Sequence, residues 1–407
     1  MRDELLKLHE ADMGADEAEA LSAVLDSGWL TRGPRTARFE QELGRYVGVD
    51  EMLGTNSCTA ALHLGLAVAG IGPGDEVIVP AQTFAASANV VAHCGARPVL
   101  ADVRPDTHTI DPGHVAQLIT ERTRAIIPVH FAGTPADLDE LTELADRHGL
   151  FLLEDCAHAI EAQYRGKPVG VGGSPATRFA AYSFYTTKNL ITGEGGMLAC
   201  RSAADRQRAQ VLGLHGMSAD AWQRYSGAGG GGGFKLYDIV AAGYKYNMFD
   251  LQAALGLAQL IKLDANWERR RARVAQYNEL IADIEGVTPL NYPAHVKSAY
   301  HIYLVRLDPA LIKAQPAAAD GVPHASPVRD GVINALRRRQ VEAYVHYICL
   351  SETEFYRKLL GTDSATTPVA ADLARRSITL PLFPTMAPAD VEYVVAMLKE
   401  ALGEVCG

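Results

Sequence analysis

The stretch LFLLEDC (150–156) places four apolar residues directly before two carboxylates, as in a buried β-strand that ends in polar residues. Three similar runs precede it, namely EVIVPA (76–81), RPVLADV (97–103) and RAIIPVHF (124–131). These runs are short and rich in Val and Ile, and amphipathic stretches such as PADLDELTELADRHG (135–149) separate them. The alternation predicts an α/β fold with a mainly parallel sheet covered by helices on both faces.

Polar residues just after the predicted strands are candidates for a binding site. Ligands of such sheets gather beyond the carboxyl ends of the strands. Asp155 and His158 follow the strand-like run at 150–156, and Lys188 follows FAAYSF (179–184). We therefore expect these three side chains to lie at one edge of the sheet.

The remainder of the chain predicts a second, smaller domain. A helical pattern covers 250–284, with Asp250 as a plausible cap, and a strand-like run follows at 301–307. Further helices are expected around 329–340 and from about 388. We expect a large domain over 1–260 that begins with a helical arm at about 1–30, and a small domain over 261–407. The glycine-rich stretch from Ser226 to Phe234 predicts a mobile loop.

Composition excludes several classes of protein. With 48% hydrophobic and 21% charged residues the chain has an ordinary globular composition, and its net charge of −10 disfavours binding to nucleic acid. The basic runs 269–273 and 337–339 are interpreted as solvated helix faces. No signal sequence or membrane span is evident, so we expect a cytoplasmic protein with no membrane contact. Six scattered cysteines predict reduced thiols, with neither disulfides nor a metal site.

Three separate features together indicate a pyridoxal phosphate site. The turn that opens GTNSCTAALHLGLAVAGI (54–71) offers backbone N–H groups and hydroxyls to a phosphate. Asp155 can keep a pyridine nitrogen protonated, and Lys188 can attach covalently to the cofactor. We expect burial and nearby positive charge to lower the pKa of that lysine. Taken singly, the three features also fit a capped helix, an N-cap and a surface lysine.

Longer motifs resemble the DegT/DnrJ/EryC1/StrS family of sugar aminotransferases. The similarity runs from about residue 10 to the C-terminus, and its motifs are EDCAHA (154–159), SFYTTKNLITGEGG (183–196), GYKYNMFDLQAALGLAQL (243–260), GWLTRGP (28–34) and PAQTFAASANVV (80–91). The resemblance implies the type I pyridoxal-phosphate-dependent aminotransferase fold, with a small α+β C-terminal domain.

The resemblance also implies roles for residues around the cofactor ring. Lys188 matches the lysine that binds the cofactor covalently and shuttles protons, and Asp155 matches the partner of the pyridine nitrogen. His158 matches a residue beside the cofactor. Phe84 matches a side chain placed against the ring face, although core packing is an alternative.

Further matched positions concern the phosphate and the substrate. The phosphate cradle corresponds to Ser57, Cys58, Thr59 and Ala60, and Ser183 corresponds to a serine that contacts the same phosphate.

Asn247 corresponds to a residue that reaches the phosphate of a neighbouring subunit, which implies a homodimer with shared active sites. Thr31 and His346 correspond to the substrate side, with a buried structural histidine as the alternative for His346.

The implied reaction transfers an amino group from glutamate or glutamine to a nucleotide-linked keto-sugar. The motif TGEGG (192–196) favours C4 of the hexose over C3. Alternatives are a keto-inositol aminotransferase of aminocyclitol synthesis and a non-catalytic, cofactor-binding regulatory protein. A Rossmann oxidoreductase is disfavoured because no G-x-G-x-x-G follows the first strand.

Overall fold

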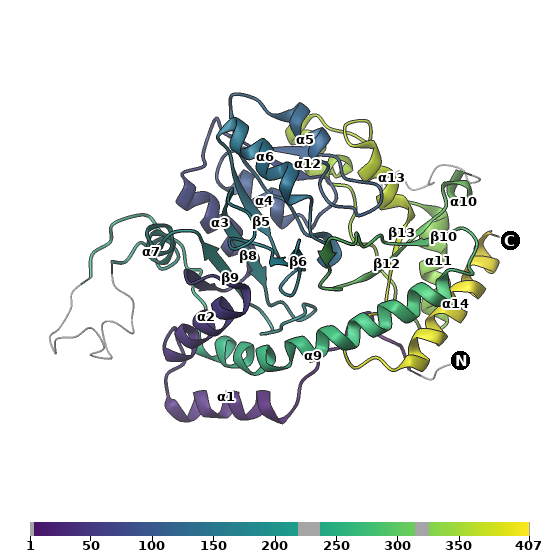
Figure 1. Ribbon diagram of the computed structural model, residues 1–407, viewed down its shortest axis with the longest axis horizontal. Coiled ribbons are helices and arrows are strands. Elements are labelled where there is room, and N and C mark those ends of the chain that lie inside the picture. Colours follow the sequence, from purple (N-terminus) through teal and green to yellow (C-terminus); the bar gives the residue numbers. More distant parts are fainter. Residues whose placement is uncertain (1–3, 219–236, 314–324, 407) are drawn as a thin grey trace.

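A seven-stranded sheet forms the centre of the computed structural model (Figure 1), which describes residues 4–218, 237–313 and 325–406. The glycine-rich stretch at 226–234 therefore lies outside the described residues. The strand order is β1-β9-β8-β5-β4-β2-β3, and β9 is antiparallel to both of its neighbours. The strands are β1 (Met52–Thr55), β2 (Glu76–Pro80), β3 (Arg97–Ala101), β4 (Thr123–Ile126), β5 (Phe151–Asp155), β8 (Thr177–Ser183) and β9 (Gly196–Cys200).

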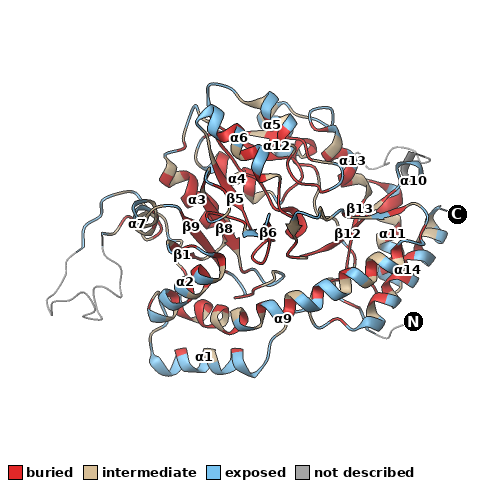
Figure 2. Cartoon of the chain, in the orientation of Figure 1, coloured by how far each residue is buried: buried red, intermediate tan, exposed pale blue. Residues whose placement is uncertain are grey.

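Helices cover both faces of this sheet, as the alternation in the sequence predicts. Adjacent residues of a strand point to opposite faces, so Leu152 and Leu153 enter two different hydrophobic cores. The helices in this part of the fold are α1 (Ala15–Ser27), α2 (Pro34–Val47), α3 (Cys58–Ala69), α4 (Ala86–His93), α5 (Pro112–Leu118), η1 (Phe131–Gly133), α6 (Leu138–His148) and α7 (Ala203–Leu212). Figure 2 shows the buried strands between helices whose outer faces are exposed.

Helix α9 (Asp250–Ile281) runs along one side of the molecule and leads into a second sheet (Figure 1). This sheet is antiparallel, and its strand order is β10-β12-β13. The strands of that sheet are β10 (Val287–Pro289), β12 (Tyr303–Leu307) and β13 (Ser377–Leu380). The helices after α9 are α10 (Pro309–Lys313), α11 (Pro327–Arg338), η2 (Leu350–Glu352), α12 (Glu354–Leu360), α13 (Pro368–Arg376) and α14 (Pro388–Cys406). A small third sheet consists of β11 (Val296–Lys297), β6 (Gln163–Tyr164) and β7 (Lys167–Pro168).

A third hydrophobic core surrounds the second sheet. It takes Val274 and Tyr277 from the second half of α9, which fits a small domain that begins within this helix. Leu6 joins this core from the N-terminus, whereas Tyr356 of α12 packs in a core of the large sheet. The division of the chain at residue 261 remains a proposal, and both parts of the chain contribute segments to the other.

The role expected for Asp250 was wrong in one respect. The N-cap position of α9 is Phe249, and Asp250 is the first helical residue. Its carboxylate accepts hydrogen bonds from the backbone N–H groups of Gly33 at 2.8 Å and Thr36 at 2.9 Å. Asp250 therefore caps helix α2, far away in the sequence, and ties the start of α9 to it.

The basic run at 269–273 is also only partly a solvated face. Arg270 is buried and forms a 2.5 Å ion pair with the buried Glu161. The other basic run, 337–339, ends in Arg339, which pairs with Glu400 and Glu404 of α14.

The state of the cysteines and the length of the helices can also be read from the structure. All six cysteine thiols are free, and five of them are at least partly buried. Among the residues that the structure describes, no helix has both the length and the apolar character needed to cross a membrane.

Candidate active site

The predicted site residues gather at the carboxyl edge of the parallel strands. Asp155 is the last residue of β5 and Ser183 the last residue of β8. Lys188 lies in the loop after β8, and Phe84 lies in the loop after β2. This edge is where the sheet topology places a ligand.

The N-terminus of α3 faces the same edge. Ser57 is its N-cap, and the Ser57 hydroxyl accepts a hydrogen bond from the backbone N–H of Ala60 at 3.1 Å. The Cys58 thiol lies 3.9 Å from the Asp155 carboxylate, which brings the turn and the carboxylate together. Among the described residues the N–H groups of Cys58 and Thr59 have no hydrogen-bond partner and are available to an anion, whereas that of Ala60 already donates to Ser57.

Asp155 is a buried carboxylate held by neutral donors. The Ser87 hydroxyl donates to it at 2.8 Å, and the backbone N–H of Ala157 donates at 3.1 Å. Burial raises the pKa of Asp155, while these hydrogen bonds and the charge of Lys188 oppose that rise. The bond from Ala157 shows that Asp155 caps the turn after β5, but no helix begins at residues 156–162, so the alternative of an N-cap for the next helix was wrong.

Lys188 is the basic group of the site. Burial lowers the pKa of Lys188 to about 8, so about a tenth of its amine is unprotonated at pH 7. The expectation that positive charge contributes was wrong, because the neighbouring acidic groups, Cys58 and Asp155, act in the opposite direction. Desolvation alone accounts for the lowered pKa.

His158 is a buried neutral histidine at this edge. Its Nε2 is 3.1 Å from the Tyr347 hydroxyl, its ring centroid is 4.2 Å from that of His301, and its Nδ1 has no partner among the described residues. Burial holds the pKa of His158 well below the usual range, and the charge of Lys188 adds to that effect.

His346 lies near this group, and its ring centroid is 4.9 Å from that of Tyr347. Its Nδ1 is 2.9 Å from the Thr379 hydroxyl. Burial, with a contribution from Lys188, lowers the pKa of His346 to about 4. His346 is half-buried and lies close enough to Lys188 to sense its charge, and its place on the substrate side stays a prediction.

Three predicted residues lie at the margins of this group. Phe84 is 61% exposed, and its ring centroid is 5.9 Å from that of Tyr347, so it is not a core residue. Thr31 lies just before helix α2, and its carbonyl accepts a hydrogen bond from the backbone N–H of Asp250 at 3.2 Å. Asn247 pairs with Thr55 in an antiparallel bridge, two residues before the Ser57 cap of the same chain.

The residues present fit pyridoxal phosphate. When bound, this cofactor supplies a ring that withdraws electrons from the carbon bearing the transferred amino group. The buried carboxylate of Asp155 has only neutral hydrogen-bond donors, and a protonated pyridine nitrogen would provide the missing cation. A Cβ at Gly196 would lie 2.4 Å from the carbonyl carbon of Ser57, so the close packing of the cradle requires glycine there.

Sequence reasoning missed four residues of the site. Ser87, Tyr347, Asn189 and His301 each contact a predicted residue or its neighbour through a hydrogen bond or a ring contact. Ser87 lies within the motif PAQTFAASANVV and Asn189 directly follows Lys188, so their positions in the motifs were the available signal. Tyr347 directly follows the predicted His346, which was the available signal for it, whereas no local pattern marks His301 as a site residue.

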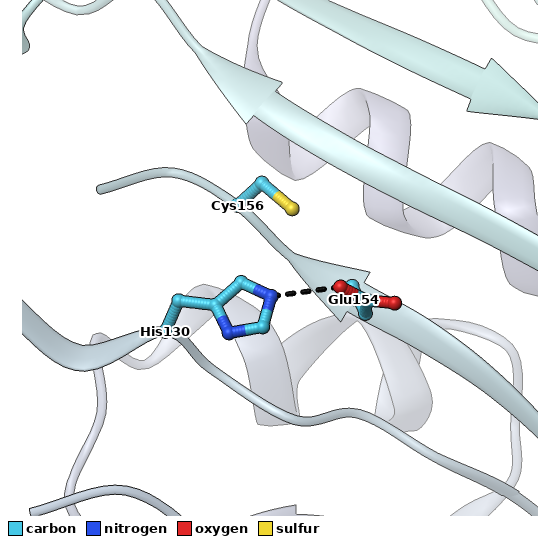
Figure 3. Close-up of side chains that lie close together, drawn as sticks. All are labelled: His130, Glu154 and Cys156. Carbon is cyan, nitrogen blue, oxygen red and sulfur yellow. Dashed lines mark hydrogen bonds and ion pairs between the residues drawn. The ribbon is translucent and has the colours of Figure 1, made fainter. Parts of the chain in front are cut away.

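Glu154 and Cys156, the two neighbours of Asp155 in the chain, form a buried cluster with His130 (Figure 3). Its atoms could in principle surround a metal ion. However, the His130 Nδ1 accepts a hydrogen bond from the backbone N–H of Ala136 at 3.1 Å, so a neutral His130 carries its proton on Nε2. That Nε2 donates to Glu154 at 2.8 Å and has no lone pair for a metal. The hydrogen bonds therefore support a structural role for the cluster.

The fold and this edge of the sheet define a pyridoxal-phosphate-dependent aminotransferase. The chain belongs to the DegT/DnrJ/EryC1/StrS aminotransferase family, which it matches over residues 11–399.

Relatives agree with this membership. The chain is 39% identical over 390 residues to the spore coat polysaccharide biosynthesis protein SpsC of Bacillus subtilis (strain 168), with 95% of each chain covered. It is similar to the PLP form of the putative sugar aminotransferase Spr1654 from Streptococcus pneumoniae, with 31% identity, a TM-score of 0.86 and coverage of 99% and 100%. DesV of S. venezuelae is 33% identical, with a TM-score of 0.82 and coverage of 94% and 93%. The protein is thus an enzyme of the sugar aminotransferase class, and pyridoxal phosphate is its cofactor.

Proposed function

We propose that the enzyme transfers an amino group from glutamate or glutamine to a keto-sugar carried on a nucleotide, and that it aminates C4 of the hexose. The observation that carries the proposal is the position of Lys188 in the loop after β8, at the same edge of the sheet as the buried carboxylate of Asp155 at the end of β5. Burial lowers the pKa of Lys188 to about 8. A lysine with this pKa can give up and take back a proton near neutral pH. Both halves of an amino-group exchange require that ability.

We assign the roles of the other residues on the same basis. Asp155 holds the pyridine nitrogen, and His158 lies beside the ring as a neutral imidazole. The first N–H groups of α3, with Ser57, Thr59 and Ser183, hold the phosphate.

The proposed sugar substrate rests on the relatives and on one motif. SpsC is a protein of spore coat polysaccharide biosynthesis, and Spr1654 is a putative sugar aminotransferase. The preference for C4 rests on the motif TGEGG, in which the carbonyl of Glu194 accepts hydrogen bonds from Thr192 at 2.7 Å and Gln252 at 2.6 Å. A cytoplasmic location is proposed from the sequence alone.

We further propose a homodimer in which Asn247 reaches the phosphate of the partner. The Asn247 amide nitrogen is the group that can donate to a phosphate; within the described part of the chain it donates to the Met248 carbonyl at 3.1 Å, which leaves its second N–H group for the phosphate. Large apolar side chains near the predicted residues are exposed, and a second copy would cover them. They are Phe84 (61% exposed), Tyr185 (44%), Val240 (61%) and Phe249 (38%).

The substrate proposal is tested in two half-reactions. The enzyme is first incubated with glutamate or glutamine, and formation of the keto acid is measured. The aminated enzyme is then offered 4-keto and 3-keto hexoses, each with and without the nucleotide. We expect turnover with the nucleotide-linked 4-keto sugar. Equal rates with the free sugar, or a preference for the 3-keto isomer, would contradict the proposal, and Lys188→Ala is the inactive control.

The shared-site proposal is tested by mixing two inactive variants, Lys188→Ala and Asn247→Trp. With shared sites, a heterodimer contains one site with both defects and one intact site, so activity returns after subunit exchange. With self-contained sites every site carries one defect, and verified heterodimers remain inactive.

A further inference from the structure

Asn189, the residue after Lys188, forms hydrogen bonds through both the nitrogen and the oxygen of its side-chain amide. The Asn189 nitrogen donates to the Glu161 carboxylate at 2.8 Å and to the carbonyl of Ala299 at 3.0 Å. The Asn189 oxygen is 3.0 Å from the Nδ1 of His301. Exchanging oxygen and nitrogen would set the amide oxygen against two acceptors, so these partners fix the orientation of the amide.

A buried ion pair anchors this amide. Glu161 and Arg270 are both almost completely buried and lie 2.5 Å apart. The Arg270 guanidinium also lies 3.4 Å from the carbonyl of Ala299. Helix α9, the loop after β5 and the segment before β12 therefore meet at the residue next to Lys188, and Asn189 joins them.

The orientation of Asn189 determines the tautomer of His301. Because the Asn189 oxygen can only accept, the Nδ1 of His301 must carry the proton. Burial holds the pKa of His301 well below its usual range, so the ring is neutral and Nε2 bears a lone pair.

The His301 ring lies close to Lys188. His301 and Lys188 line the same small cavity, together with Asn189 and Arg270. No hydrogen bond to the Nε2 of His301 is present among the described residues, and the ring lies against His158 with centroids 4.2 Å apart. The free lone pair of His301 Nε2 is therefore on a ring that lines the same cavity as the Lys188 side chain.

We propose that Asn189 and His301 are positioning residues for Lys188. In this arrangement Asn189 fixes His301 as the Nδ1–H tautomer, and the Nε2 of His301 accepts a hydrogen bond from the Lys188 ammonium when the lysine side chain turns toward it within the cavity that both residues line. This bond orients the amine and stabilises its protonated form. The proposal rests on Lys188 as the reactive lysine, but its test measures the amine itself and does not require turnover.

Other groups also act on this amine and remain unchanged in the test. Those that exchange electrostatic effects with Lys188 are Cys58 of α3, Asp155 of β5, His158 after β5, His346 before η2 and His9 of the N-terminal segment. Of these, Cys58 and Asp155 raise the pKa of Lys188.

The test compares two amides at position 301 in the cofactor-free enzyme. His301→Asn keeps a donor where Nδ1 was but places no polar atom at the position of Nε2. His301→Gln places its amide where Nε2 was. The pKa of Lys188 is read from the pH dependence of its acetylation by limiting acetic anhydride, followed by peptide mass spectrometry.

We expect the pKa of Lys188 to fall by about one unit in His301→Asn, a tenfold change in its protonation equilibrium. In His301→Gln the pKa should stay close to that of the unchanged enzyme. Trp267→Phe is the matched control, because it removes a 2.8 Å hydrogen bond to the carbonyl of Ser298 in the same segment without touching Asn189 or His301. Equal values in His301→Asn and His301→Gln, or an equal fall in Trp267→Phe, would overturn the proposal.

A second measurement covers the case in which the variants at position 301 do not fold. Nitrogen NMR of histidine-labelled protein reports the His301 tautomer in the unchanged enzyme and in Asn189→Ala. We expect the Nδ1–H form in the unchanged enzyme and a mixture in Asn189→Ala. A predominant Nε2–H form in the unchanged enzyme would contradict the assignment.

Discussion

Glu154 and Asp155 are consecutive carboxylates on β5, and they face opposite sides of the sheet. The Glu154 carboxylate accepts hydrogen bonds from His130 at 2.8 Å, from the backbone N–H of Gly170 at 2.6 Å and from the Thr177 hydroxyl. Asp155 faces α3 at the carboxyl edge of the parallel strands, where fewer hydrogen-bond donors contact it than contact Glu154. Both carboxylates have only neutral donors, but Asp155 has fewer of them and lies at the edge of the sheet where a cationic ligand can reach it.

This difference shows what separates a structural carboxylate from a functional one in the same strand. Both are buried, so burial alone does not distinguish them. The distinction comes from their partners, because a carboxylate whose oxygens are saturated by fixed donors cannot take a ligand. This difference can be tested by changing each carboxylate, or a residue bonded to it, in turn.

The largest effect is expected for Asp155→Asn. The substitution keeps the shape of the side chain and removes the charge that, as we propose, holds the pyridine nitrogen protonated. We expect turnover to fall about 100-fold or more, with little change in thermal stability. Single-turnover kinetics with glutamate, together with a thermal melt, check both statements. Near-normal turnover would mean that Asp155 is only a cap for the turn after β5.

The matched change on the other face, Glu154→Gln, should show the reverse pattern. The Thr177 hydroxyl can turn to accept a hydrogen bond from the new amide, while the amide oxygen keeps the bonds from Gly170 and His130. The loss of charge assistance should lower the free energy of unfolding by about 1–2 kcal/mol. We expect turnover to stay within about threefold of the unchanged enzyme, since Glu154 does not face the cofactor edge. Denaturant unfolding and steady-state kinetics decide the outcome, and a drop in turnover like that of Asp155→Asn would abolish the distinction.

A smaller effect is expected for Ser87→Ala, which removes the 2.8 Å hydrogen bond to Asp155. A donor to a carboxylate favours its charged form, so its loss raises the pKa of Asp155. The acid limb of kcat/KM against pH should therefore move to higher pH, with a loss of about tenfold in rate at neutral pH. Thr83→Val is the control, because Thr83 contacts the Ser87 hydroxyl at 3.0 Å and not the carboxylate. An unchanged acid limb in Ser87→Ala would show that this bond does not set the titration.

The smallest effect is expected from metal ions. Since His130 carries its proton on the nitrogen that faces Glu154, added zinc or prolonged dialysis against EDTA should leave the melting temperature unchanged. A zinc-dependent rise that disappears in His130→Gln would show that the cluster opens to bind metal.

Much of this arrangement is predictable from the sequence. The runs at 76–81, 124–131 and 150–156 predict strands β2, β4 and β5, and the polar residues that follow such runs include Asp155 and Lys188. Local periodicity carries this information because side chains alternate along a strand and repeat along a helix.

Contacts between distant segments were not predictable in the same way. Arg270 belongs to a basic run that favours solvent, and only Glu161, 109 residues away, explains its burial. Asp250 caps a helix more than 200 residues earlier in the chain. His301 and Tyr347 reach the site because the segments that carry them pack against it, and no periodic pattern encodes that packing.

The most direct test of the account is the site of covalent attachment of the cofactor. The purified enzyme, loaded with pyridoxal phosphate, is reduced with borohydride, digested and mapped by mass spectrometry. The account predicts a single labelled residue, Lys188, and loss of the label in Lys188→Ala. A reduced adduct on any other lysine would contradict the central assignment.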